Sequence, residues 1–193
     1  MDLQHVNVKL LLHQTGDADL EPVIPVFHTW IQDQVCEELL LDVADYRHVH
    51  AGPGVVLVGH EANYSVDNSD SKLGVRYNRK AAVEGNNQDR LAQALRAALI
   101  ACQRLESDPR LHGLLRFNGQ EIEVFINDRL LAPNTQETRA ALQPEFQAFF
   151  EKLFVVGGFS LSNNAHDPRR LFSLSVRSTQ AFSVSDLLKN LPS

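Results

Sequence analysis

The chain has 193 residues, of which 44% are hydrophobic and 22% charged, and its formal net charge is −6. This length and balance are typical of a globular domain with a buried core, so we expect a single domain over residues 1–193. Acidic and basic residues are mixed along the chain, which leaves no extended basic surface for a phosphate backbone and argues against a nucleic acid partner.

Membrane and disulfide-rich classes are also disfavoured. No apolar run approaches the ~20 residues that span a bilayer, and the first residues, MDLQHVNVKLLLHQ, carry an acid where a signal peptide carries basic residues. The two cysteines, Cys36 and Cys102, lack CxxC spacing, so neither a disulfide framework nor a zinc knuckle is indicated. We therefore expect a cytoplasmic protein without a membrane partner.

The first part of the chain predicts the order βαββ. HVNVKLLLH (5–13) has the composition of a strand, and apolar residues at three- and four-residue spacing predict an amphipathic helix over 22–34. ELLLDVA (38–44) is a second strand. VVLVGHEANYSVD (55–67) is a long strand with a glycine at a bend or bulge.

The middle of the chain adds a strand and a long helix. KLGVRYNRK (72–80) is predicted to pair with the preceding strand through a turn at 67–72. A helix over 87–106 follows from one apolar stripe, formed by Leu91, Leu95, Ala98, Cys102 and Leu105. The pair Asn118-Gly119 predicts a hairpin between LLRF and EIEVF, because both residues tolerate positive φ.

The last part repeats the order βαββ. After the strand EIEVFIND (121–128), Asn134 with Glu137 marks a helix start, and Pro144 interrupts that helix. The strands GFSLS and LFSLSV follow, and SVSDLLKNL is a short helix begun by Ser183 or Ser185.

A shared proline-anchored pattern links the two parts. PVFHTWIQ and PEFQAFFE place aromatic and apolar residues at the same distances from proline, so we expect Trp30 and Phe149 both to face the sheet. The prediction is an α+β fold with a mixed or antiparallel sheet and helices on one face. It consists of two weakly related βαββ halves, about 1–80 and 107–180, joined by the helix 87–106.

The stretch DYRHVHAGPGVVLVGHE (45–61) is the first candidate site. His48 and His50 form an HxH pair, and His60 can add a third imidazole to a metal. HxH is a weak motif, and the alternative is a polar loop. The later loop that contains His166, Asp167, Arg169 and Arg170 is equally polar. No cofactor is predicted, and a divalent metal at the three histidines is left open.

A second candidate lies on the predicted strands. His60 and Tyr64 share a face at period two, Tyr77 or Arg79 is expected opposite Tyr64, and Asp67 lies near the turn. Such a cluster can transfer protons or hold a carboxylate. Its plainer interpretation is a hydrogen-bonded polar patch on a sheet.

The approach to the long helix is a weaker, anion-binding candidate. Arg79 and Lys80 precede Gly85, and helix N-termini attract anions. Neither GxGxxG nor GxxxxGK[ST] occurs, so a plain capped helix start is the alternative.

The sequence is compatible with two functions. One is a cytosolic, non-enzymatic binding or assembly module that docks a protein partner or forms a homo-oligomer, for instance through an edge strand such as LFSLSV. The other is a small enzyme or a small-ligand or metal-binding protein that uses residues 42–79. The absence of a complete catalytic signature favours the first.

Overall fold

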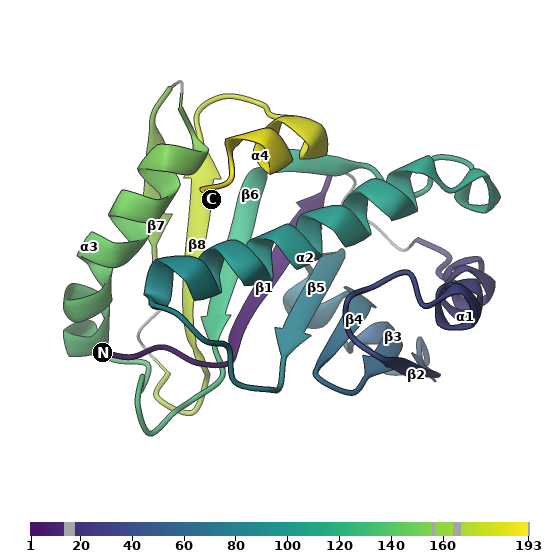
Figure 1. Ribbon diagram of the computed structural model, residues 1–193, viewed down its shortest axis with the longest axis horizontal. Helices are drawn as coiled ribbons and strands as arrows, with labels where there is room; N and C mark the ends of the chain where they lie inside the picture. Colours follow the sequence, from purple (N-terminus) through teal and green to yellow (C-terminus); the bar gives the residue numbers. More distant parts are fainter. Residues whose placement is uncertain (14–17, 156, 164–166, 193) are drawn as a thin grey trace.

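The computed structural model describes residues 1–13, 18–155, 157–163 and 167–192, and these form one eight-stranded sheet with four α-helices (Figure 1). The strand order is β2-β3-β4-β5-β1-β6-β8-β7, and every neighbouring pair is antiparallel. The predicted α+β class is confirmed.

The elements have the following bounds. The strands are β1 (Val6–Leu12), β2 (Leu40–Tyr46), β3 (Gly54–Gly59), β4 (Ala62–Asp67), β5 (Gly74–Arg79), β6 (Phe117–Ile126), β7 (Phe159–Ser162) and β8 (Phe172–Ser178). The helices are α1 (Val23–Asp33), α2 (Asn87–Ser107), α3 (Gln136–Leu153) and α4 (Val184–Asn190), with short 3-10 turns at Ser69–Ser71 and Pro109–Leu111.

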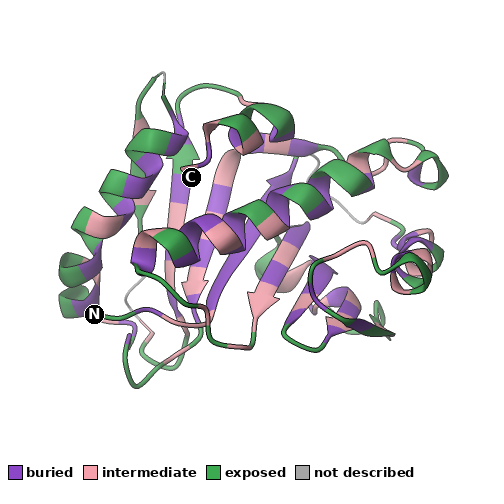
Figure 2. Cartoon of the chain, in the orientation of Figure 1, coloured by how far each residue is buried: buried purple, intermediate pink, exposed green. Residues whose placement is uncertain are grey.

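The helices lie on one side of the sheet. Figure 1 shows α2 crossing in front of the central strands with α3 and α4 on the same side, and α1 packs against β2 and β3. On β6, Ile122, Val124 and Ile126 are buried toward the helices, while Glu123 and Phe125 point the other way. We call the face that carries Glu123 and Phe125 the open face, because no helix in the described part of the chain covers it. Figure 2 shows the resulting alternation of burial along the strands.

The predicted apolar stripe of α2 is confirmed. All five of its members are buried against the sheet, namely Leu91, Leu95, Ala98, Cys102 and Leu105. A capping box closes the first turn: the Asn86 side chain accepts from the backbone N–H groups of Gln88 and Asp89, and the Asp89 carboxylate accepts from the Asn86 N–H. Since α2 contacts β1 and β5, it packs on the centre of the sheet.

The strand predicted over 55–67 is two strands. The chain turns at His60 and Glu61, so that β3 and β4 pair as a tight hairpin with Leu57 opposite Tyr64. Gly59 permits this turn, because a Cβ at that position would lie 2.5 Å from the Ala62 carbonyl oxygen.

The hairpin predicted at Asn118-Gly119 is wrong. β6 runs unbroken from Phe117, and the positive φ of Gly119 (+60°) lies within that strand, next to a register shift in its pairing with β1. A Cβ at Gly119 would lie 1.8 Å from the carbonyl oxygen of Phe182, so the glycine allows the later segment to pass close by.

The predicted break in the second long helix is also wrong. α3 continues through Pro144, and its N-cap is Thr135, whose hydroxyl accepts from the N–H of Thr138. Pro144 leaves the carbonyl of Ala140 without a helical donor, but both residues are exposed, and water can take the donor's place. The closing helix α4 begins at the predicted cap, Ser183.

The strand LFSLSV is not an edge. β8 lies between β6 and β7, and the sheet ends at β2 and β7. β1 and β6 are neighbours inside the sheet. On its other side β1 pairs with β5, and β6 pairs with β8. The internal duplication stays a prediction. None of the helices within the described ranges is long and apolar enough to cross a bilayer.

Trp30 and Phe149, both predicted to face the sheet, are buried in the core. Replacing Trp30 by Ala should lower the free energy of unfolding by about 3–5 kcal/mol, because a cavity would remain where its ring packs 5.3 Å from that of Phe27. Leu130→Ala is the control, since Leu130 is 99% exposed and its loss should cost less than ~0.5 kcal/mol. Urea unfolding followed by circular dichroism measures both. A loss below ~1 kcal/mol for Trp30→Ala would contradict a core position.

Candidate functional site

The two strand tyrosines of the second sequence candidate meet as predicted. Tyr64 on β4 pairs directly with Tyr77 on β5, and their ring centroids are 5.1 Å apart. Both side chains are buried beneath the helices. Arg79 lies two residues further along β5 on the same face.

A buried carboxylate joins these tyrosines. The hydroxyl of Tyr64 donates to Oε2 of Glu38 at 2.8 Å, and the hydroxyl of Tyr77 donates to Oε1 at 2.7 Å. Glu38 is only 4% exposed, and it lies just before β2. Sequence reasoning missed it, because Glu37 and Glu38 are adjacent acids and no local pattern says which one turns inward. The one signal for it is that two buried tyrosine hydroxyls need a hydrogen-bond acceptor.

Gln93 of α2 extends this network. Its Nε2 donates to the Tyr77 hydroxyl at 2.9 Å. Because that hydroxyl gives its own proton to Glu38, it can only accept from Gln93, which fixes the orientation of the amide. Oε1 of Gln93 is buried and accepts no hydrogen bond from the described residues. The network therefore contains an acceptor without a donor.

Arg79 lies at one side of the hydrogen-bond network around Glu38. Its Nη1 lies 3.3 Å from Oε2 of Glu61 and 3.9 Å from Oε1 of Glu38. Its Nε donates to the carbonyl of Ala81. The guanidinium thus contacts the rim acid Glu61 more closely than the buried Glu38.

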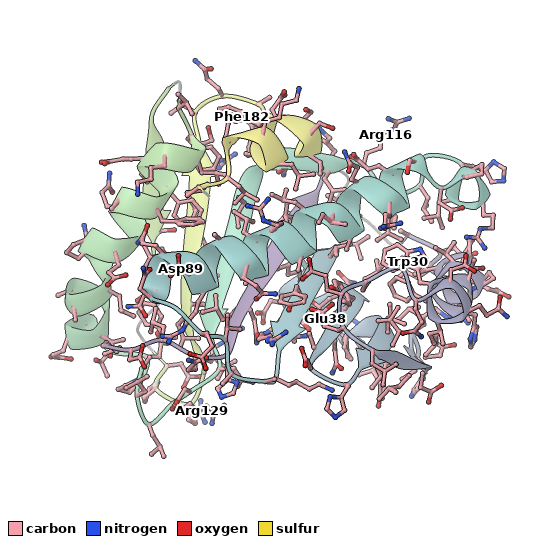
Figure 3. All side chains as sticks on the ribbon, in the orientation of Figure 1. Trp30, Glu38, Asp89, Arg116, Arg129 and Phe182 are labelled. Carbon is pink, nitrogen blue, oxygen red and sulfur yellow. The ribbon has the colours of Figure 1, made fainter. Side chains whose placement is uncertain are left out.

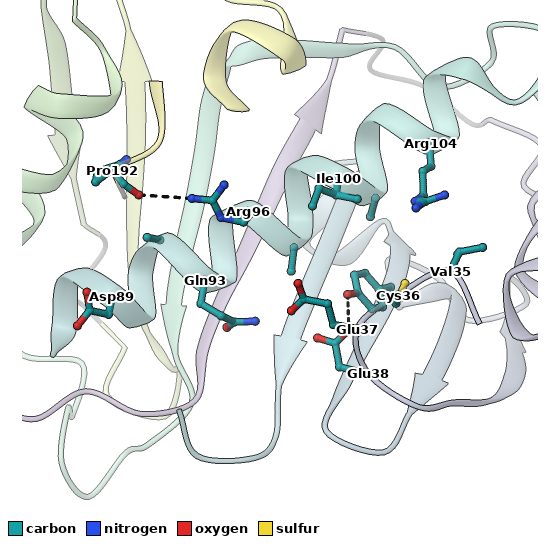
Figure 4. Close-up of a pocket in the computed structure, with 14 residues that line it drawn as sticks. Val35, Cys36, Glu37, Glu38, Asp89, Gln93, Arg96, Ile100, Arg104 and Pro192 are labelled. Carbon is teal, nitrogen blue, oxygen red and sulfur yellow. Dashed lines mark hydrogen bonds between the residues drawn. The ribbon is translucent and has the colours of Figure 1, made fainter. Parts of the chain in front are cut away.

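The network borders a cavity of about 480 Å³ between α2 and the segment that leads into β2 (Figure 4). We call it the Glu38 pocket. The apolar part of its α2 wall includes Ala92, Ala97 and Ile100. Figure 3 places Glu38 below α2, on the side of the molecule that also holds Trp30. Its charged lining residues are Glu37, Glu38, Asp89, Arg96 and Arg104.

Burial keeps the hydroxyls of Tyr64 and Tyr77 and the thiol of Cys36 protonated. Desolvation raises the pKa of Tyr64 and of Tyr77 well above the usual value, and it raises the pKa of Cys36 to about 11. The two phenols and the thiol are therefore neutral at physiological pH. Cys36 is not a thiolate nucleophile under these conditions.

His60 and Asp67 do not belong to this site. The prediction that His60 continues the face of Tyr64 is wrong, because the chain turns there and the side chain is exposed. Asp67 points to the open face, where it forms a buried ion pair with Lys9 at 2.5 Å. Because successive side chains of β4 point to opposite faces of the sheet, Asp67 lies on the face opposite to that of Tyr64 and Val66.

The metal candidates are not brought together. His48 and His50 lie in the exposed turn after β2, and His60 lies in the turn between β3 and β4. No group of three or more His, Cys, Asp or Glu side chains suited to a metal ion occurs within the described ranges. A divalent metal at these histidines stays a prediction. In the later, equally polar loop of the sequence, His166 lies outside the described residues. Asp167 pairs with Arg169, and Arg170 pairs with Asp70.

The weaker anion candidate has its groups engaged elsewhere. Lys80 donates to the carbonyl of Gly59 at 2.5 Å, and Gly85 adopts a positive φ (+92°) next to the side chain of Asp89. The α2 terminus already holds the Asp89 carboxylate in its capping box. The start of α2 is therefore a capped helix terminus, and Arg79 and Lys80 contact other groups.

Comparison with models of known protein families gives no match, and neither does comparison with curated proteins. A functional conclusion therefore depends on the chemistry of the Glu38 pocket. Its key side chains come from α2, β4, β5 and the segment before β2, so the pocket requires the folded sheet.

Replacing Tyr64 or Tyr77 by Phe should each lower the free energy of unfolding by about 1.5–3 kcal/mol, because each removes a hydrogen bond to a charged acceptor. Glu38→Ala should cost about 3 kcal/mol or more, since it leaves the hydrogens of two buried hydroxyls without an acceptor. Tyr46→Phe is the matched control, because Tyr46 is exposed. Urea unfolding measures the series. Strict additivity of Glu38→Ala and Tyr64→Phe in the double variant would contradict their hydrogen bond.

Alkylation tests the state of Cys36. With a folded pKa of about 11, its thiol should react more slowly with iodoacetamide at about pH 8 than in the urea-unfolded chain, and the rate should continue to rise toward pH ~11. Peptide mass spectrometry separates Cys36 from Cys102, which is fully buried and should remain unlabelled in the folded protein. A rate for Cys36 that levels off below pH ~8 would contradict this environment.

Proposed function

We propose that the protein is a non-enzymatic binding module whose Glu38 pocket holds a small molecule with an apolar body and a protonated amine. The cavity of about 480 Å³ is within the ~300–1,000 Å³ usual for small-ligand sites. Its α2 wall offers Ala92, Ala97 and Ile100 to an apolar body. Its inner end offers hydrogen-bond acceptors to the amine.

The observation that carries this proposal is the excess of acceptors around Glu38. The carboxylate receives two tyrosine hydrogens, whereas two carboxylate oxygens have about four acceptor positions. Oε1 of Gln93 accepts no hydrogen bond from the described residues. An ammonium group supplies three donors and a positive charge, and it therefore suits both acceptors.

The protonation states favour binding over catalysis. Cys36, Tyr64 and Tyr77 all have raised pKa values because burial disfavours their ionised forms. A catalytic nucleophile or base of these types would need the opposite shift. Glu38 is held by two donors, which is the arrangement expected of a ligand-orienting group.

A protein partner or a homo-oligomer has less support. The strand expected to pair with another chain, β8, is internal to the sheet. That alternative depends instead on β2, which is an edge strand and exposes Leu41 and Tyr46. Both cysteines are free, in keeping with the cytosolic setting that we propose.

Calorimetric titration with 2-phenylethylamine tests the proposal. Wild-type protein should bind it with a dissociation constant of about 1 mM or lower, and 3-phenylpropionate, which replaces the amine by an acid, should not bind measurably. Ile100→Trp should weaken binding roughly tenfold, because the larger side chain fills the pocket.

Leu130→Trp is the control for the Trp substitution, since Leu130 is exposed and does not line this pocket. It should bind the amine like the wild type. Preference for the acid over the amine, or equal binding by Ile100→Trp and the wild type, would overturn the proposal.

A further inference from the structure

The open face contains a second cavity, of about 660 Å³, that the Glu38 pocket does not reach. We call it the basic basin. It is bordered by β5, β6 and β8 and by the loops around Asp70 and Arg170. Its cationic lining residues are Lys72, Arg76, Arg129, Arg169 and Arg170. Among the described residues, two carboxylates line it with them, those of Asp70 and Glu123.

Each carboxylate at the basin has a cation of its own. Asp67 lies beneath it and is paired with Lys9, and both side chains are almost fully buried. The other pairs are Glu123 with Lys72, Asp70 with Arg170, and Asp167 with Arg169. In these pairs each carboxylate is bound to another cation, so the remaining cations of the basin have no ion-pair partner among the described residues.

Two guanidinium groups remain. Arg76 is half-buried, lies 4.3 Å above the ring of Phe125, and donates from Nε to Asn78, but no carboxylate of the described residues lies within ion-pair distance. Arg129 forms no hydrogen bond or ion pair with the described residues, although the Asp167 carboxylate lies close enough to interact with its charge. Burial lowers the pKa of Arg76, and the nearby charges of Asp67, Glu123 and Asp70 offset that effect only in part.

We propose that the basic basin binds a small molecule bearing phosphate groups, with phosphate oxygens contacting Arg76 and Arg129. Guanidinium groups donate in a planar fork that matches phosphate oxygens. Hydroxyl groups of Ser162, Ser173 and Ser175 line the same cavity and supply further donors. A diphosphate carries enough negative charge to compensate both free guanidinium groups.

The size and surroundings of the basin favour a small molecule over a nucleic acid. The chain as a whole carries a formal charge of −6, so the positive charge is local to one cavity. A nucleic acid backbone requires an extended basic surface. A compact phosphate ligand needs only the basin.

Inorganic pyrophosphate is the probe, used in calorimetric titrations at low ionic strength. Wild-type protein should bind it, and Arg129→Gln should weaken binding about tenfold or more through loss of charge-assisted hydrogen bonds. Arg129 is exposed, so this variant should fold normally. Arg76→Gln should weaken binding to a similar degree, and circular dichroism shows whether it is folded.

Arg139→Gln is the matched control. It makes the same charge change on α3, outside the basin, and should leave binding within about twofold of the wild type. Pyrophosphate should also bind Ile100→Trp normally, which separates this site from the Glu38 pocket.

Several results would overturn the proposal. They are no binding of pyrophosphate, equal binding by Arg129→Gln and the wild type, and an equal loss in Arg139→Gln. Tighter binding of citrate would assign the basin to carboxylates instead of phosphates. Tighter binding of a single-stranded oligonucleotide would assign it to nucleic acid.

Discussion

A sheet covered by helices on one face only is the constraint on which the rest of the structure depends. Side chains alternate along each strand, so every strand must divide its residues between an apolar interior and the open face. β4 shows the result directly: Tyr64 enters the core beside Glu38, and Asp67 reaches the open face beside Lys9. One strand therefore contributes to two separate polar networks.

Both networks bury charge, but they are compensated differently. Lys9 and Asp67 neutralise each other, and burial lowers the pKa of Lys9 while Asp67 opposes that shift. Glu38 is held mainly by two neutral hydroxyls, and the nearest atom of Arg79 is 3.9 Å away. Acids outnumber cations by three to two among the charged residues that line the Glu38 pocket, whereas cations outnumber carboxylates by five to two among those that line the basic basin. This difference is the physical basis for assigning them ligands of opposite sign.

The sequence correctly predicted those features of the fold that are determined by local residue patterns. The stripe of α2, the cap at Ser183 and the pairing of Tyr64 with Tyr77 follow from residue spacing and side-chain chemistry. Features that depend on distant segments could not be predicted in this way. Gly119 accommodates a close approach by Phe182 instead of turning a hairpin, and Glu38 is identified only by tyrosines that lie far along the chain. The free charge of Arg76 likewise emerges only when the strands are placed side by side.

The central claim is that the two faces of the sheet hold independent ligand sites of opposite charge preference. Two-dimensional NMR with 2-phenylethylamine and pyrophosphate, added separately and together, tests it most directly. The amine should shift the side-chain amide of Gln93, and pyrophosphate should shift the Nε–H signals of Arg76 and Arg129, with neither ligand altering the affinity of the other. Shifts of the same residues by both ligands, or by neither, would contradict the claim.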